Sequence, residues 1–390
     1  MNDLLGWEVD VFEKAGDDLA SRGAGIATHD EMFSVIRRLG LQLDESYGIL
    51  VNRRRVIGKN GEVQNDLPNG RLMSSWSRLY KPLKDHFPQN HYHFGKNLRN
   101  IEFHDVFARA IFEDSTQVDA DLILGCDGFR SKVRQLVFPQ TALNYASYIA
   151  WRGVVEEAEM SIQLRENLIE HVYALPHGQF LAIYPVPGHN DDIRPGNRRC
   201  NLIWYHPTSL QDLEKMCIDV NGHHHGNSIS PDLIRPDVIT LMRNNAKKLF
   251  APSIVQFIDL IKKPFFQPIF DLESHSVISR RVVLMGDAAF VARPHLGMGT
   301  TKAALDANWF VDSILNFPDD LSLAFTRYNK NVTLFGSRCV AYSRFLGAHL
   351  EAQITQLKHL QNGIGSQHLP LPQAFGPRLR EIPELAELID

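Results

Sequence analysis

Hydrophobic and polar positions divide the chain into segments of different character. Residues 7–13, "WEVDVFE", alternate and are rich in β-forming side chains, so they predict a strand that ends at Glu13. After a Gly-containing loop, the pattern predicts a helix from about His29. Residues 119–137 predict a buried strand, a turn and a short helix capped by Ser131. Together these segments are typical of an α/β unit.

The pattern changes between Tyr148 and Trp204. The runs "YIAWRGVV", "FLAIYPVP" and "CNLIWYHP" are rich in aromatic residues and are separated by Pro and Gly turns, which predicts an antiparallel sheet. "HSVISRRVVLMGD" then predicts a strand of the α/β type, followed by helix to about Leu360 and a Pro-rich tail.

The predicted fold is therefore a discontinuous α/β domain that carries an inserted antiparallel domain. We divide the chain into a first α/β part (1–147), the inserted sheet (148–270), a second α/β part (271–345) and a C-terminal helix with a Pro-rich tail (346–390).

Composition narrows the class of protein. Hydrophobic residues make up 44% of the 390 residues and charged residues 22%, which is typical of a soluble globular protein. The net charge of -4 gives no electrostatic reason to expect nucleic acid as a partner. No apolar run approaches the ~20 residues that span a bilayer, and the N-terminus does not resemble a signal peptide. The four cysteines stand far apart, so we expect a reduced, cytoplasmic protein without a metal site.

One stretch, "VVLMGDAAFVARPHLGMGTTKAALDA" at 282–307, carries the candidate chemistry. A buried strand ends at Gly286-Asp287, where the carboxylate can accept hydrogen bonds from hydroxyl groups at the edge of the sheet. Gly297 and Gly299 allow a planar ring to approach the backbone.

The N-terminus of the helix predicted after this turn favours negatively charged ligands. Thr300 and Thr301 are candidate caps for it, and its positive N-terminus would face negative charge on a bound ring. Taken alone, Gly286-Asp287 is better explained as an ordinary strand-to-helix turn with an Asp cap. The added spacing of Pro294, Gly297 and Gly299 favours a ligand site.

This stretch resembles the second FAD-binding motif of the flavin-dependent aromatic hydroxylases, commonly GDAAH-x-x-x-P-x-x-G-x-G-x-N. "DLILGCDGFRSKVR", with Asp127 and Gly128, is similar to the Asp-Gly motif of that family. Glu13, with Lys14 beside it, stands where the family binds the adenosine ribose. "WRGV", "AIYPVPG" and the "IWY" run resemble the dihydroxypyridine monooxygenase branch. The resemblance covers nearly the whole chain.

The resemblance implies a glutathione-reductase-type FAD domain of Rossmann-like topology with an inserted substrate domain. It also implies an FAD-dependent monooxygenase that uses NAD(P)H and O2 to hydroxylate an aromatic or N-heteroaromatic small molecule. On this basis the cofactor-binding residues are those of the three motifs: Glu13, Lys14, Asp127, Gly128, Gly286, Asp287, Pro294, Gly297, Met298, Gly299, Thr300 and Thr301.

The sequence departs from the family pattern at several positions. The usual histidine, glutamine and asparagine are replaced by Phe290, Met298 and Thr301. Trp76 stands where relatives often carry an arginine near the flavin. No G-x-G-x-x-G precedes Glu13, and "NDLLGW" resembles the last turn of the helix that this motif should open.

The absence of these glycines leaves two interpretations. The chain is either a truncated form of a working enzyme or a decayed relative that binds flavin poorly. A flavin epoxidase or oxidase on the same scaffold is a further alternative. In all cases we expect weak FAD binding, because the missing segment would hold the pyrophosphate. A preparation fully loaded with flavin would contradict this expectation.

For catalysis, the candidates are His295 and Arg293, which flank Pro294. An unperturbed histidine has a pKa of about 6.5 and can accept a proton from a ring hydroxyl, although bracing of the turn explains His295 equally well. Tyr184 and Trp204 are candidate substrate contacts, with sheet packing as the alternative. "GHHHG" at 222–226 and the Arg53–Arg55 run are interpreted as solvated segments. The oligomeric state stays open, with a homodimer as one candidate.

Overall fold

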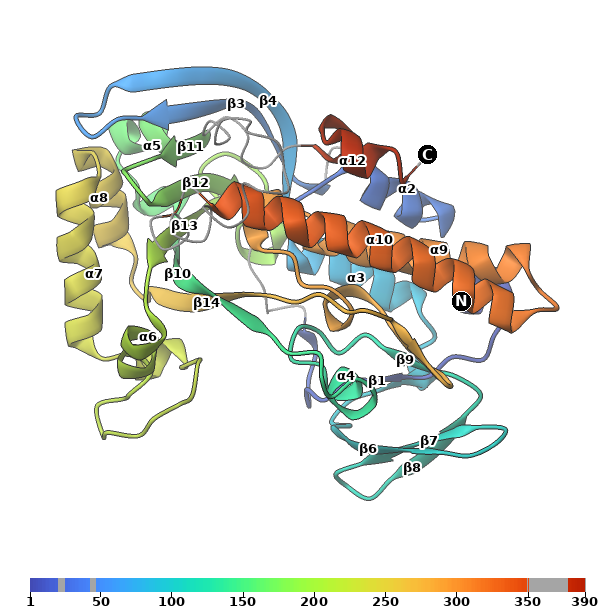
Figure 1. The fold of residues 1–390 in the computed structure, drawn as a ribbon. Coiled ribbons are helices and arrows are strands. Elements are labelled where there is room, and N and C mark those ends of the chain that lie inside the picture. Colours follow the sequence, from blue (N-terminus) through green and yellow to red (C-terminus); the bar gives the residue numbers. More distant parts are fainter. Residues whose placement is uncertain (20–24, 43–46, 349, 351–377, 390) are drawn as a thin grey trace, which may run out of the picture.

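The structure is a computed structural model that describes residues 1–19, 25–42, 47–348, 350 and 378–389. Among these residues it has an α/β part, an eight-stranded sheet and helices on both faces of that sheet (Figure 1). The predicted α/β fold with an inserted antiparallel sheet is confirmed.

Two small sheets each contain one parallel pair of strands. β1 pairs with β5 in parallel, and β9 pairs in parallel with β16, which also pairs with β15. In the described part of the chain, no strand joins these two sheets. The strands are β1 (Val11–Phe12), β5 (Tyr92–His93), β9 (Ile123–Gly125), β15 (Ile278–Ser279) and β16 (Val282–Leu284). The predicted strand over 7–13 is thus shorter than expected.

The large sheet has the strand order β14-β10-β13-β12-β11-β3-β4-β2. Its neighbours are antiparallel except for the parallel pair β11–β3. The strands are β2 (Gly25–Ala27), β3 (Ile49–Ile57), β4 (Val63–Ser75), β10 (Asn144–Glu156), β11 (His171–Ala174), β12 (Phe180–Val186), β13 (Arg199–Pro207) and β14 (Phe265–Asp271). The sheet therefore extends beyond the inserted segment and includes three strands from the first 75 residues.

The two faces of this sheet bury different side chains, because alternate residues of a strand point to opposite faces. One face packs against α5 (Ile162–Leu168), α7 (Pro236–Leu249) and α8 (Pro252–Leu260). The other face packs against the segment around Leu296 and Met298 and the two long helices α9 (Gly299–Asn316) and α10 (Leu321–Gly347). Figure 1 shows α7 and α8 on one side of the strands and α10 on the other.

The remaining elements are peripheral. They are α1 (Asn2–Leu5), α2 (Asp30–Arg38), α3 (Trp76–His86), α4 (Lys132–Val137), α6 (Leu210–Met216), α12 (Pro383–Ala386) and a small sheet of β6 (Leu98–Phe103), β7 (Ala108–Phe112) and β8 (Gln117–Ala120). The predicted Ser131 cap is confirmed, since its Oγ accepts from the Arg134 N–H at 2.8 Å. The predicted helix to Leu360 ends at Gly347 in the described residues, and most of the predicted Pro-rich tail lies outside them.

Candidate cofactor and substrate site

The Gly286–Asp287 turn lies at the carboxyl end of β16, beside the carboxyl end of β9. The strands are in parallel register, with Leu284 opposite Gly125. Gly286 has φ of +59°, a conformation that favours glycine, and an added Cβ would lie 3.3 Å from the Cβ of Ala303. The turn is therefore held close against α9.

The side chain of Asp287, the next residue, is exposed but partly surrounded by protein. Solvent reaches its side chain, yet surrounding protein desolvates the carboxyl and raises its pKa, against the opposing positive charge of Lys302. A carboxylate that solvent can reach can accept a hydrogen bond from a ligand hydroxyl.

The Asp127–Gly128 turn after β9 is tied to the turn after β16. The Asp127 carboxylate accepts from the hydroxyl of Ser131 and from the Val133 N–H at 3.0 Å, so it stabilises the start of α4. Arg134 of α4 then donates to the Ala288 carbonyl at 3.0 Å. In this arrangement Asp127 positions the loop, while Gly128, with φ of +77°, makes the turn.

The two glycines of the Gly-x-Gly segment have different roles. Gly297 has φ of +63°, and an added Cβ would lie 3.2 Å from the Cβ of Ala27, so it allows close approach of β2. A Cβ at Gly299 would meet nothing within 4 Å. The open space in front of a planar ring is thus at Gly299, where α9 begins and its free N–H groups point outward.

The predicted threonine caps are wrong. α9 begins at Gly299 with Met298 as its N-cap residue, and no side chain caps it. Thr300 and Thr301 therefore lie inside the first turn, and Thr301 is fully buried. Met298 is buried and packs on the face of the sheet that α9 and α10 cover, called the inner face below. Pro294 is exposed.

Glu13 directly follows β1, and one of its carboxylate oxygens accepts from the Ala15 N–H at 2.8 Å. The half-buried carboxylate stands at the carboxyl end of a parallel strand, where dinucleotide-binding proteins hold a ribose. Lys14 beside it is exposed.

His295 and Arg293 lie inside the protein. His295 Nε2 is 2.7 Å from the hydroxyl of Tyr148 on β10, and its ring contacts that of Tyr205 on β13, with centroids 4.6 Å apart. A Cβ added at Gly347 of α10 would lie 2.9 Å from the same nitrogen. His295 therefore connects the stretch from Gly286 to Thr301, called the motif segment below, to the sheet and to α10.

Arg293 belongs to a buried ion cluster. Its Nε donates to Asp271 at 2.8 Å, and Arg344 donates to the other oxygen of Asp271 at 2.7 Å. Burial acts to raise the pKa of Asp271, but the hydrogen bonds and charges of the two arginines outweigh it, so this pKa is lowered. This geometry makes Arg293 a positioning residue that ties the motif segment to β14 and, through Asp271, to α10.

The two predicted substrate residues lie on opposite faces of the sheet. Tyr184 lies on the inner face, where it contacts His171. Trp204 lies on the other face, where it donates to Gln179 at 2.8 Å and packs on Phe250. The structure thus brings Tyr205, not Trp204, next to His295.

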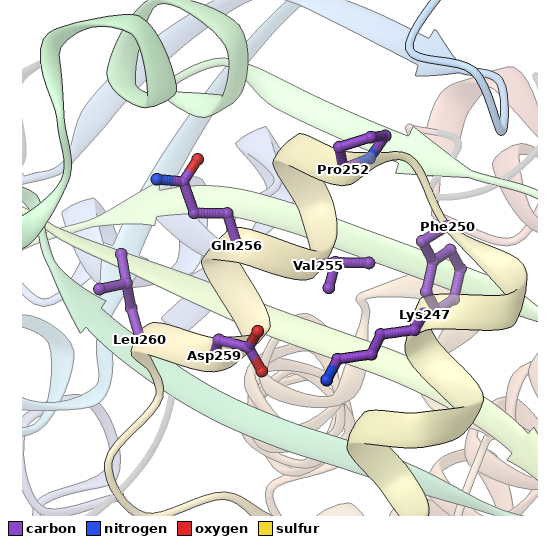
Figure 2. A pocket seen from close by; sticks show the side chains of 7 residues that line it. All are labelled: Lys247, Phe250, Pro252, Val255, Gln256, Asp259 and Leu260. Carbon is purple, nitrogen blue, oxygen red and sulfur yellow. The ribbon is translucent and has the colours of Figure 1, made fainter.

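Other sequence features lie apart from this cluster. Trp76 donates to the Leu19 carbonyl at 3.2 Å, and in "GHHHG" His225 pairs with Asp219 at 2.9 Å. Arg53 pairs with Asp66 on the exposed side of β3. Figure 2 shows an open hollow between α7 and α8, on the far face of the sheet, lined by Lys247, Phe250, Pro252, Val255, Gln256, Asp259 and Leu260.

The sequence analysis missed several residues of the site: Arg134, Tyr148, Tyr205, Asp271, Lys302, Asp306 and Arg344. Lys302 and Asp306 carried a weak signal, because they stand four residues apart in the helix after the Gly-x-Gly segment.

Comparison with known proteins agrees with this geometry. An "FAD binding domain-like" family matches residues 145–271. The 2,6-dihydroxypyridine 3-monooxygenase of Paenarthrobacter nicotinovorans is 28% identical over 307 residues, which cover 77% of this chain and 75% of that protein. The chain is therefore similar in sequence to FAD-dependent aromatic hydroxylases.

Two fungal enzymes are also similar to the chain. A salicylate hydroxylase from Sarocladium schorii is 26% identical over 56% of this chain and 43% of its own length. An FAD-dependent monooxygenase from Hypocrea jecorina is 27% identical over 59% of this chain and 50% of its own length. The chain thus spans half or less of these two fungal relatives.

Solved structures show the same fold. The 2,6-dihydroxypyridine-3-hydroxylase from Arthrobacter nicotinovorans superposes with a TM-score of 0.81 at 23% identity, over 95% of this chain and 90% of that one. HpxO from Klebsiella pneumoniae, solved with FAD and uric acid, superposes with a TM-score of 0.67 at 18% identity, over 93% and 88%. In the described part of this chain, no helix is long and apolar enough to cross a membrane.

Proposed function

We propose that this chain holds FAD at the Gly286–Asp287 turn and the N-terminus of α9 and hydroxylates an aromatic or N-heteroaromatic small molecule. NAD(P)H is the proposed reductant and O2 the proposed oxidant. The observation that carries the proposal is that the motif segment packs directly on the aromatic inner face of the sheet. His295 of that segment touches both Tyr148 and Tyr205.

The residues present fit FAD. Asp287 offers an acceptor for a ribityl hydroxyl, and the carboxylate of Glu13 offers one for the adenosine ribose. The open space at Gly299 admits a planar ring, and the N–H groups at the start of α9 favour negative charge on that ring. Bound FAD would supply the transfer of electrons and the activation of oxygen.

The chain's own residues would then bind and activate the aromatic substrate. Tyr184 and Tyr205 lie on the inner face of the sheet, on the side of the flavin motif, and offer aromatic side chains for contact with the substrate ring. His295 can take a proton from a ring hydroxyl at Nδ1, while the Tyr148 hydroxyl holds Nε2 through the 2.7 Å contact and steadies the imidazolium that forms. Loss of that proton makes the ring more electron-rich and hence easier to hydroxylate.

The test is oxygen incorporation by the chain saturated with FAD. NADH or NADPH is supplied under ¹⁸O2 with 2,6-dihydroxypyridine and salicylate as first probes, since relatives act on these compounds by name. We expect one of the two probes, or a hydroxylated analogue, to gain one ¹⁸O atom. NAD(P)H oxidation that never labels an aromatic product would contradict the proposal.

A further inference from the structure

Lys302 is a buried cation in the first turn of α9. Its side chain is 2% exposed, and its ammonium donates to the Gly286 carbonyl at 2.7 Å. Lys302 also lies 3.3 Å from Oδ2 of Asp306, and that same oxygen accepts from the Gly286 N–H at 2.9 Å. Both polar backbone groups of Gly286 are therefore held by side chains of one helix.

Packing alone does not explain this lysine. A buried ammonium loses its hydration, and a methionine of similar length would fill the same space without that cost. Asp306 is 1% exposed, and its second oxygen, Oδ1, has no hydrogen-bond partner in the described residues. The pair therefore keeps a costly charge in the core, directly behind the turn that presents Asp287.

We propose that Lys302 is a positioning residue for Asp287. Its bond to the Gly286 carbonyl fixes the turn that keeps the Asp287 side chain exposed to solvent, and its positive charge keeps that carboxylate in the acceptor form. The proposal rests on the proposed function, because it takes the ligand of Asp287 to be a hydroxyl of FAD.

The direction of the pH effect follows from the charges around Asp287. Burial raises the pKa of Asp287 and Lys302 lowers it, so removing Lys302 raises this pKa further. FAD affinity that depends on the ionised carboxylate must then be lost at a higher pH as the solution is acidified. The other charged or titratable groups around this turn are Asp306, Cys126, Asp127, Arg134, Tyr328 and Cys339.

The experiment compares Lys302→Met with Lys302→Arg, which retains the charge. FAD affinity is measured by flavin fluorescence from about pH 5 to about pH 8. We expect Lys302→Met to weaken binding about tenfold at neutral pH and to move the acid midpoint up by about one pH unit. Lys302→Arg should restore the midpoint even if its affinity stays low.

A purely structural lysine would give a different result. It would lower affinity equally at every pH and leave the midpoint unchanged, and this outcome would overturn the proposal. Asp287→Asn is the matched control, because it should abolish the pH dependence and make Lys302→Met nearly neutral. If Lys302→Met does not fold, Lys302→Gln takes its place.

A second readout needs no FAD. The ¹³C resonance of the Asp287 carboxyl, assigned by its loss in Asp287→Asn, reports the ionisation of that group in the free chain. We expect its midpoint to rise in Lys302→Met. If the wild type binds no FAD, the proposed function fails while this titration still decides the role of Lys302; an unchanged midpoint would overturn it.

Discussion

The hydroxyl of Tyr148 lies 2.7 Å from Nε2 of His295, so one hydrogen bond joins the inserted sheet to the flavin-motif segment. Both side chains are buried, and burial raises the pKa of Tyr148 far above its usual value. The tyrosine therefore stays protonated at neutral pH and can donate to the imidazole. This contact allows both roles predicted for His295, a base and a brace, and mutation can separate them.

We expect His295→Asn to retain FAD and to be reduced by NAD(P)H at a normal rate. Without the base, the substrate hydroxyl keeps its proton, so more of the reduced cofactor's electrons should end in H2O2 and fewer in product. The measurement is the ratio of H2O2 to hydroxylated product at saturating FAD. Loss of flavin, or an unchanged ratio, would show that His295 only braces the segment.

Tyr148→Phe is the companion variant. It removes the hydroxyl but keeps the ring, so it should lower the free energy of unfolding by about 1 kcal/mol, the usual net value of one hydrogen bond. Urea unfolding measures this loss. A stability equal to that of wild type would mean that the 2.7 Å contact contributes nothing to the docking of the sheet.

Asp287→Ala should weaken FAD binding and leave the fold intact. Losing a hydrogen bond to a charged acceptor costs about 1.5–3 kcal/mol, which corresponds to a roughly ten- to hundredfold weaker Kd. Asp319→Ala, at an exposed position on the loop before α10, is the control and should leave the Kd unchanged. Equal FAD affinity in Asp287→Ala and wild type would show that Asp287 contributes to the turn and not to FAD binding.

Asp271→Asn should be strongly destabilising. It leaves Arg293, which is 2% exposed, beside a neutral amide, and breaking a buried pair costs about 3–5 kcal/mol. The matched control is Asp192→Asn, which breaks an ion pair with the exposed Arg194 and should cost less than about 1 kcal/mol. Similar losses in the two variants, measured by urea unfolding, would contradict a supporting role for the buried cluster.

Acid should destabilise the fold partly through His29 and His171. Burial, with a contribution from Arg71, lowers the pKa of each to about 3. Between that value and about pH 6.5 the unfolded chain binds protons that the folded chain does not. Each histidine therefore removes up to about 1.4 kcal/mol of stability per unit of falling pH.

His171→Gln tests this pH dependence. Its stability should fall less steeply than that of wild type between about pH 6.5 and about pH 5. His189→Gln, at an exposed position, is the control and should keep the wild-type slope. Equal slopes in all three proteins would show that His171 is protonated in the folded state.

Local spacing predicted the Gly286–Asp287 turn, the Ser131 cap and the alternation of α/β and β-rich segments. It did not predict the neighbours of His295, because Tyr148 is 147 residues away in the sequence. Nor could it place Tyr184 and Trp204 on the correct faces. Every residue of β12 is buried, so the two-residue period that distinguishes an inner face from an outer one is lost.

The capping residue at the start of α9 was predicted wrongly for a different reason. Thr300 and Thr301 are good capping residues, but the helix begins at Gly299, so the pattern placed its start too late. A lysine in a first turn is usually exposed, so the four-residue spacing of Lys302 and Asp306 indicates at most a surface pair and not the buried one observed. The pair is buried because the turn after β16 packs on the helix, and this tertiary contact cannot be read from local spacing.

FAD titration of the purified chain tests the central claim most directly. The fluorescence of added FAD should be quenched on binding and should saturate at one equivalent per chain, with a shift in the flavin absorption spectrum. Asp287→Ala should weaken this binding. A linear, unsaturable response with an unshifted spectrum would contradict a flavin site at the Gly286–Asp287 turn.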